Sequence, residues 1–394
     1  MKRPFLTLFI AVGLIGSSYA ADFVPGRVLV KPADGADEAA VQGSLKAAGA
    51  REIGRVPQIG VRILQVPAQA EARVIAALSN NPNIEFAEPD YIANIILTPN
   101  DPYYSAYQWH LPKVSAPSAW DTTTGSSAVT VAVVDSGVQA NHPDLVGRVL
   151  AGYDFVNNDS DPADDNGHGT AVAGVAAAKG NDGIGVAGAA WNVAILPVKT
   201  MNSSGSGSYS AIANGITYSA DRGAKIINLS LGGTLSSSTL QNAVSYAWNK
   251  GSLLVAAAGN NGSSTTVYPA AYPNVVAVSA TTSADTLASF SSYGSFVDLS
   301  APGQDITTTW IGSSYVTISG TSFSSPLTAG VAALALSRTP ALSNAQISSL
   351  LTGNTDDLGA VGYDTFFGSG RLNAAKVVSA APSVDTTAPV TAVT

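Results

Sequence analysis

Three short stretches of the sequence each present one residue that can take part in nucleophilic catalysis. Asp135 ends the string V-A-V-V-D, His168 lies within N-G-H-G-T, and Ser322 lies within G-T-S-F-S-S-P. These residue types can act together, because a carboxylate orients an imidazole and the imidazole accepts the proton of a hydroxyl group. The order Asp, His, Ser along the chain therefore predicts a proton-relay and nucleophile set that attacks acyl groups.

The residues around each candidate indicate which element would hold it. The apolar, β-branched run 130–134 predicts a buried parallel strand that ends at Asp135. His168 precedes the small-residue run 171–178, which favours a helix packed closely on a sheet. Ser322 also opens an apolar helical stretch, and the free N–H groups at the start of a helix favour negative charge.

The histidine is the best determined member of the set, because the sequence contains only three histidines. His110 lies in a loop-like stretch and His142 belongs to the turn string N-H-P-D-L, whereas His168 has a glycine on either side. Taken alone, a strand-terminal aspartate can also cap a turn, and G-T-S is a common helix entrance. The order and surroundings of all three residues together favour catalysis.

Residues 98–380 alternate apolar runs with helical patterns. This alternation predicts an α/β fold, a doubly wound and mostly parallel sheet with helices on both faces. The predicted strands are 130–134, 149–155, 193–199, 226–230, 253–257, 275–280 and 297–300, and the predicted helices are 170–178, 209–221, 238–250, 322–337 and 344–351.

The remaining parts of the chain have other compositions. Residues 1–20 combine a basic start, an apolar stretch and small residues at the end, which is typical of a signal peptide. Residues 21–97 show the order strand, helix, strand, strand, helix, strand, which predicts a small α+β domain of ferredoxin-like type. Residues 381–394 are rich in Thr and Pro and are interpreted as a linker-like tail.

The chain resembles the subtilisin-like serine peptidases, and most closely their thermitase-like branch. The resemblance covers about residues 99–380 and rests on strings that occur in the family's order. They are T-P-N-D-P-Y (98–103), V-Q-A-N-H-P-D-L (138–145), A-N-G-I-T-Y (213–218), S-L-G-G-T (230–234), A-W-N-K-G-S (247–252) and A-A-A-G-N (256–260).

This resemblance implies an endopeptidase that cleaves protein or peptide substrates through an acyl-enzyme intermediate. Asp135, His168 and Ser322 are then the catalytic triad, and Asn260 with the backbone N–H of Ser322 stabilises the oxyanion. A role for Asn260 as a turn former after Gly259 is the alternative.

Two segments of small residues follow predicted buried strands and favour binding of an extended peptide. These segments carry almost no side-chain bulk, so an extended peptide could pair with their backbones. The alternative is that the small residues only permit tight packing. We expect Val267 to narrow the pocket between them and to disfavour cleavage after Phe or Tyr. The predicted substrate-binding residues are Ser230, Leu231, Gly232, Gly233, Ala257, Ala258 and Gly259.

In subtilisin-like precursors a unit such as residues 21–97 is an intramolecular chaperone and inhibitor, and the resemblance implies the same role here. We expect self-cleavage between residues 92 and 100. An unrelated folded appendage is the alternative.

Acidic residues cluster just before His168. Carboxylates on one loop repel one another unless they are solvated or bridged by a hard cation such as Ca²⁺. The resemblance implies one calcium site at Asp154, Asn157, Asp159 and Asp161, and another at Asp101, Asp144 and Asp182. Ala163 lacks the side-chain oxygen that the thermitase-like branch has there, and a solvated loop is the alternative for the first set.

The chain departs from the family pattern beside the predicted nucleophile. Phe323 and Ser324 follow Ser322 where the family usually has Met-Ala, Leu327 stands in place of a histidine, and Ala171 stands where G-H-G-T-H is usual. None of these departures removes a catalytic atom.

Composition agrees with a secreted, extracellular hydrolase. The sequence has no cysteine, which excludes disulfides, thiolate metal sites and a cysteine nucleophile. Its net charge of −8 disfavours nucleic acid and anionic membranes as partners. Gly, Ser, Asn and Pro interrupt every later apolar run before it reaches membrane-spanning length, and we expect a monomer.

Two other classes of function remain open from the sequence. One is an inactive, calcium-stabilised binding scaffold on a peptidase fold, which the intact set of four candidate catalytic residues disfavours. The other is an esterase or lipase, but Ser322 lacks the G-x-S-x-G string and the order Asp, His, Ser differs from that class.

Overall fold

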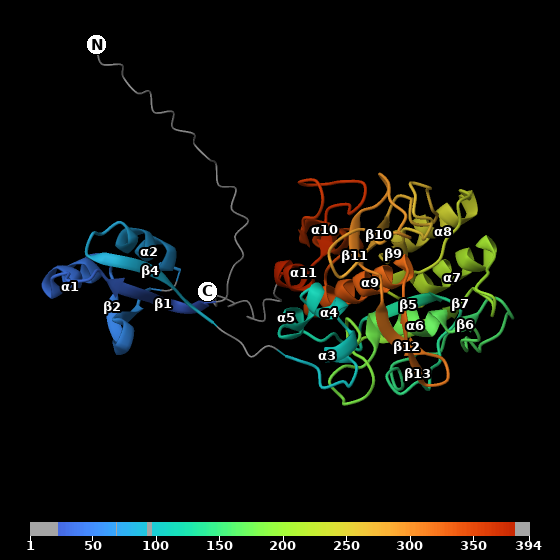
Figure 1. Ribbon diagram of the computed structural model, residues 1–394, viewed down its shortest axis with the longest axis horizontal. Coiled ribbons are helices and arrows are strands. Elements are labelled where there is room, and N and C mark those ends of the chain that lie inside the picture. The colour runs from blue at the N-terminus through green and yellow to red at the C-terminus, as the bar shows by residue number, and fades with distance from the viewer. Residues whose placement is uncertain (1–22, 68, 93–96, 383–394) are drawn as a thin grey trace, which may run out of the picture. The chain divides into compact units, whose positions relative to one another are not determined.

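The computed structural model describes residues 23–67, 69–92 and 97–382. The chain divides into two compact units, residues 1–95 and 96–394, which are described separately here (Figure 1). The predicted signal peptide and residues 383–394 of the predicted tail lie outside the described residues.

The N-terminal unit is a four-stranded antiparallel sheet with two helices. Its elements follow the predicted order, and the sheet order β2-β3-β1-β4 confirms the ferredoxin-like topology. Buried apolar residues such as Val28, Leu64 and Val74 form its own core. The elements are β1 (Phe23–Pro32), α1 (Glu38–Ala47), β2 (Arg51–Val56), β3 (Val61–Gln65), α2 (Glu71–Ser79) and β4 (Ile84–Tyr91).

The larger unit is organised around a nine-stranded sheet with the order β14-β15-β11-β10-β9-β8-β5-β7-β6. Every pairing in this sheet is parallel except that between β14 and β15. The strands are β5 (Thr130–Asp135), β6 (Tyr153–Asp154), β7 (Ala194–Lys199), β8 (Ile226–Leu229), β9 (Leu253–Ala257), β10 (Val275–Thr281), β11 (Leu299–Pro302), β14 (Thr355–Asp356) and β15 (Arg371–Leu372).

Helices cover both faces of this sheet, which confirms the predicted doubly wound architecture (Figure 1). Alternate residues of β5 explain the two layers: Val131 and Val133 belong to the core cluster under α6 and α9, whereas Ala132 and Val134 belong to the cluster under α7 and α8. The helices are α3 (Tyr104–Tyr107), α4 (His110–Lys113), α5 (Ala116–Trp120), α6 (His168–Ala177), α7 (Tyr209–Asp221), α8 (Ser238–Asn249), α9 (Thr321–Arg338), α10 (Asn344–Gly353) and α11 (Ala374–Ala380).

Serine side chains begin three of these helices. Ser208 accepts a hydrogen bond from the backbone N–H of Ala211 at the start of α7, and Ser237 does the same for Leu240 in α8. Ser343 and Gln346 form a reciprocal capping box at the start of α10. These caps satisfy N–H groups that a helix leaves unpaired, and so they fix where each helix begins.

The sequence did not predict the hairpin β12 (Ile306–Trp310) and β13 (Ser314–Ile318), which packs on α6. Thr308 and Thr309 donate their hydroxyl groups to the carbonyl oxygens of Ala171 and Thr170. The approach is so close that a Cβ at Gly174 would lie 2.1 Å from the Thr309 hydroxyl. The hairpin therefore holds the helix that begins at His168.

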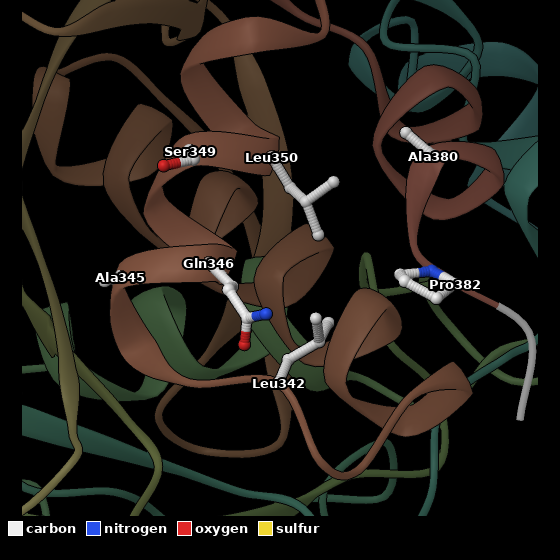
Figure 2. Close-up of a pocket in the computed structure, with 7 residues that line it drawn as sticks. All are labelled: Leu342, Ala345, Gln346, Ser349, Leu350, Ala380 and Pro382. Atoms are coloured by element: carbon white, nitrogen blue, oxygen red, sulfur yellow. The ribbon is translucent and has the colours of Figure 1, made fainter.

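An apolar hollow of about 400 Å³ lies between α10 and α11 (Figure 2). Its lining includes Leu342, Leu350 and Pro382, and none of the candidate catalytic residues. Among the described helices, none is both long and apolar enough to cross a membrane.

His110 is a fully buried residue of α4 whose two ring nitrogens have no hydrogen-bond partner among the described residues. Burial lowers the pKa of His110 to about 3, because the apolar surroundings disfavour the imidazolium form. The imidazole is therefore neutral in the folded protein at neutral pH.

Candidate active site

Asp135 and His168 are in direct contact. Asp135 is the last residue of β5 and is almost completely buried, and His168 is the first residue of α6. The distance between Nδ1 of His168 and Oδ1 of Asp135 is 2.8 Å, and the backbone N–H of Ser136 donates to the same oxygen at 2.7 Å. The aspartate therefore holds one edge of the imidazole at the end of a buried strand.

The surroundings of His168 favour its charged form. Burial alone lowers the pKa of His168, but the charge of Asp135, the hydrogen bond to it and the charge of Asp164 together outweigh burial, so the pKa is raised above 6.5. An imidazole with a raised pKa is a better proton acceptor near neutral pH.

Ser322 is the second residue of α9 and is nearly buried. Its hydroxyl group donates to the carbonyl oxygen of Ser230 at 3.3 Å, while the Ser230 hydroxyl donates to the carbonyl oxygen of Ser322 at 2.7 Å. The ring of Phe323, the next residue, lies against the imidazole of His168 with 5.8 Å between the ring centroids. The starts of α6 and α9 therefore meet beside the segment that follows β8.

Asn260 lies in the loop after β9, and its side-chain oxygen is tied to the start of α9. Oδ1 accepts hydrogen bonds from the backbone N–H and the hydroxyl group of Thr321, both at 2.9 Å. This leaves the Nδ2 donor of Asn260 for another acceptor. Sequence reasoning did not assign this role to Thr321, although the residue lies within the G-T-S string.

Asp164 organises the segment between Asp135 and His168, which the sequence did not show beyond an acidic cluster. Oδ1 accepts from the hydroxyl of Ser136 (2.8 Å) and from the backbone N–H groups of Asn166 (3.0 Å) and Gly167 (2.8 Å). Oδ2 accepts from the N–H (2.8 Å) and the hydroxyl (2.6 Å) of Thr170. One carboxylate therefore links the turn after Asp135 to the first turn of α6.

Lys199 is a second residue that the sequence analysis missed, at the end of an otherwise apolar strand. Its side chain is buried, and Nζ donates to the carbonyl oxygens of Ser136 (2.7 Å) and Met201 (3.0 Å) and to Oδ1 of Asp165 (2.5 Å). A lysine at the end of an apolar strand could have indicated this role from the sequence, because a buried lysine needs polar partners.

A cleft runs past these residues and consists of two adjoining hollows. The first, of about 270 Å³, is lined by Asp135, His168 and Met201 together with the segment Ser230–Gly232. The second, of about 200 Å³, shares Ser230–Gly232 and is lined also by Asn260 and Ser322. All four candidate catalytic residues therefore face one continuous depression.

The predicted substrate-binding residues line the second hollow, with one exception. Ala258 is fully buried and its backbone N–H donates to the carbonyl oxygen of Val278, so this N–H is not free for a substrate. Gly233 exchanges two backbone hydrogen bonds with Tyr268. The predicted substrate-binding residues that line the hollow are Ser230, Leu231, Gly232, Gly233, Ala257 and Gly259.

Val267 closes the second hollow between its two walls. A Cβ at Gly232 would lie 2.6 Å from Cγ1 of Val267, and a Cβ at Gly259 would lie 2.6 Å from Cγ2. Gly259 also has a positive φ of 108°, which disfavours any other residue there. Both methyl groups therefore occupy space that two glycines leave open.

Asp101, Asp144 and Asp182 lie within electrostatic reach of one another. Burial raises the pKa of Asp144 to about 7, and the charges of Asp182 and Asp101 add to this effect. Oδ1 of Asp101 and Oδ1 of Asp144 are buried and have no hydrogen-bond partner within the part of the chain that the structure describes. Unpaired buried carboxylate oxygens that repel one another fit the donor set of a hard cation.

The loop set Asp154, Asn157, Asp159 and Asp161 is arranged differently. Asp154, Asp159 and Asp161 each accept at least one backbone N–H of their own loop. Hydrogen bonds of this kind fit both the predicted calcium site and the alternative of a solvated loop. Over residues 23–67, 69–92 and 97–382, no three His, Cys, Asp or Glu side chains form a ready-made metal cluster.

The geometry agrees with a comparison of the chain with known protein families. The family model described as "Subtilase family" matches residues 126–370. The chain belongs to the subtilase family. It is a subtilisin-like serine protease, and residues 11–90 match the fervidolysin N-terminal prodomain.

Two curated relatives cover most of this subtilase. Thermophilic serine proteinase of Bacillus sp. (strain AK1) is 46% identical over 357 residues, covering 91% of this chain and 88% of the relative. Thermitase of Thermoactinomyces vulgaris is 52% identical over 281 residues, covering 71% of this chain and 99% of the relative. A solved protease from Pseudoalteromonas arctica, 35% identical, superposes with a TM-score of 0.68 over 73% of this chain and all of that structure.

The charge of Asp164 gives a testable prediction about pH dependence. Replacing Asp164 with Asn removes a charge that raises the pKa of His168, so the acid limb of the kcat/KM profile should move to lower pH. Asp165→Asn is the matched control, because it removes the same charge at the adjacent residue, whose carboxylate binds Lys199. An acid limb that moves equally in both variants would contradict the assignment.

Proposed function

We propose that this subtilase is a secreted serine endopeptidase that hydrolyses peptide bonds with the triad Asp135, His168 and Ser322. The observation that carries the proposal is the 2.8 Å contact between Asp135 and His168 in a cleft that Ser322 and Asn260 also line. The family membership and the prodomain match support the same reaction.

In the proposed reaction His168 accepts the hydroxyl proton of Ser322 while Oγ attacks the carbonyl carbon of the substrate. The hydroxyl first leaves the carbonyl oxygen of Ser230, to which it donates at 3.3 Å, by rotation about the Cα–Cβ bond. Asp135 holds the Nδ1–H tautomer of His168 and stabilises the imidazolium form. His168 then gives its proton to the leaving amine, and water hydrolyses the acyl-enzyme by the same steps.

The oxyanion is stabilised by two donors in this proposal. Thr321 donates two hydrogen bonds to Oδ1 of Asn260 and so holds the amide group, which leaves Nδ2 to donate to the oxyanion. The second donor is the backbone N–H of Ser322, which lies at the start of α9, where N–H groups have no partner in the helix. A fixed donor of this kind typically contributes about 10²- to 10³-fold to turnover.

The residue whose carbonyl is attacked, here called the P1 residue, would place its side chain in the second hollow. Val267 limits the depth of that hollow, because its methyl groups occupy the space that a Cβ at Gly232 or Gly259 would need. The proposed enzyme therefore prefers small or narrow P1 side chains over Phe and Tyr.

The N-terminal unit is proposed to be an inhibitor and chaperone that the enzyme removes from itself. A separate folded unit ahead of the protease and the match to a prodomain family support this. The proposed cleavage lies between residues 92 and 100, and part of that stretch, residues 93–96, lies outside the described residues. Export would be directed by residues 1–20.

We also propose that Asp101, Asp144 and Asp182 hold a structural calcium ion. The unpaired oxygens Oδ1 of Asp101 and Oδ1 of Asp144 and the mutual repulsion of the carboxylates support this site. The ion's contribution would be to neutralise this repulsion and stabilise the fold, and no catalytic step depends on it.

The self-processing proposal is tested by comparing the full chain with its Ser322→Ala variant. We expect the unmodified chain to be converted to a shorter form during expression and the exported variant to remain a precursor that retains the N-terminal unit. Intact mass and N-terminal sequencing identify the bond. Identical maturation of both chains would instead favour the inactive binding scaffold.

The P1 preference is tested with Val267→Gly. Removing both methyl groups should deepen the hollow and raise kcat/KM for a substrate with P1 Phe relative to one with P1 Ala by about 10-fold or more, on the scale of 1–3 kcal/mol for pocket changes of this size. Val244→Ala, a change in the core beneath α8, is the control for a general loss of stability. An unchanged Phe-to-Ala ratio would refute the role of Val267.

The calcium proposal is tested by thermal unfolding of the Ser322→Ala chain with and without a chelator. We expect added Ca²⁺ to raise the midpoint of unfolding, with a rise that grows with the logarithm of the free Ca²⁺ concentration above the dissociation constant, and we expect Asp101→Asn to abolish most of that increase. Asp161→Asn, in the acidic loop before His168, should retain it. A calcium effect that survives Asp101→Asn and is lost in Asp161→Asn would transfer the site to the loop.

A further inference from the structure

Met201 is a sulfur-containing residue in the lining of the cleft. The sequence contains two methionines and no cysteine, and the other methionine is residue 1, within the predicted signal peptide. Phe323, the residue that follows Ser322, has a hydrocarbon side chain without sulfur. In the catalytic unit, oxidation of sulfur therefore concerns Met201 alone.

Met201 is partly exposed and lines the first hollow together with His168 and Leu231. Its backbone is held next to the proposed catalytic aspartate, because its N–H donates to the carbonyl oxygen of Asp135 at 3.1 Å and its carbonyl oxygen accepts from Nζ of Lys199 at 3.0 Å. These bonds fix the backbone of Met201 at the wall of the substrate cleft.

The sulfur lies against the backbone of the loop that follows. A Cβ at Gly207 would lie 2.6 Å from Sδ of Met201, so the absence of a side chain at Gly207 makes room for the thioether. The loop 202–207 also supplies Gly205 to the lining of the hollow, and Nδ2 of Asn166 donates to the carbonyl oxygen of Ser203. An oxygen added to this sulfur adds volume and polarity next to the loop that helps to line the hollow.

We propose that Met201 is an oxidation-sensitive residue that determines which side chain the first hollow accepts. This inference rests on the proposed peptidase function. A hydroperoxide transfers one oxygen atom to Sδ, so that the O–O bond breaks and the S–O bond forms. The sulfur is oxidised by two electrons, and the peroxide is reduced to water or an alcohol. The apolar wall of the hollow becomes polar, while the triad and Asn260 are unchanged.

The two hollows share the segment Ser230–Gly232, so a substrate whose P1 side chain occupies the second hollow would place the side chain of its preceding residue in the first. Oxidation therefore acts on selectivity for that preceding residue. A substrate with an apolar residue there loses contacts with the thioether, whereas a substrate with Gly there has none to lose.

The experiment treats the mature enzyme with dilute hydrogen peroxide, quenches it with catalase and locates the added oxygen, about 16 Da, by peptide mass mapping. Two peptide amides with the same P1 residue and either Leu or Gly before it are then compared. We expect the kcat/KM ratio of Leu to Gly substrate to fall about 5-fold, with less than a 2-fold change for the Gly substrate. Methionine sulfoxide reductase should restore the ratio.

Met201→Leu is the matched control, since it keeps a similar volume without the sulfur. Its Leu-to-Gly ratio should be insensitive to peroxide. The proposal is overturned if Met201 gains no oxygen in the folded enzyme, if it gains oxygen without a change in the ratio, or if the Met201→Leu variant loses selectivity equally. Labelling of Ser322 by a fluorophosphonate before peroxide treatment tests the peptidase function separately.

Discussion

The contact between Asp135 and His168 joins the carboxyl end of a central strand to the first residue of a helix, and the rest of the catalytic unit serves to keep these two ends together. Because β5, β7, β8 and β9 are neighbours and parallel, their carboxyl ends lie along one edge of the sheet. That edge carries the aspartate, Lys199, the segment from Ser230 and the loop to Asn260. Helices α6 and α9 begin at the same edge and supply the histidine and the serine.

Buried and partly buried polar side chains make this arrangement rigid. Asp164, Lys199 and Thr321 each join two or more segments that are distant in the sequence, and each has its donors or acceptors paired. Satisfied networks of this kind fix one geometry, because every alternative leaves a buried polar atom without a partner. Small residues complete the effect by letting backbones approach closely, as Gly174 does under the Thr309 hydroxyl.

The sequence was sufficient for the central strands and the main helices because their apolar patterns are local. The predicted helix 209–221 coincides with α7, and the predicted strand 253–257 coincides with β9. The predicted strand 149–155 was too long, since only residues 153–154 form β6, with a single bridge from Val149 to Ile195. At Gly152 the backbone lies so near Pro197 that a Cβ would be 1.8 Å from its carbonyl oxygen.

The parts that the sequence did not reveal depend on contacts between distant segments. The hairpin β12–β13 is rich in threonine, and its burial follows from hydrogen bonds to α6 rather than from an apolar pattern. The residues that line the second hollow were predictable from two strings of small residues, but the paired N–H of Ala258 was visible only in the fold. The support from Thr321 and Asp164 likewise required coordinates.

The neutral, buried imidazole of His110 makes the stability of the protein depend on pH. An unfolded chain binds a proton at the ordinary histidine pKa near 6.5, whereas the folded chain resists protonation until about pH 3. Between about pH 6.5 and pH 3, the free energy of unfolding therefore falls by on the order of 1.4 kcal/mol for each unit by which the pH is lowered. In a solution of active protease, molecules that unfold in acid become substrates for the molecules that remain folded. Mild acidification would therefore speed the proteolytic loss of the protein.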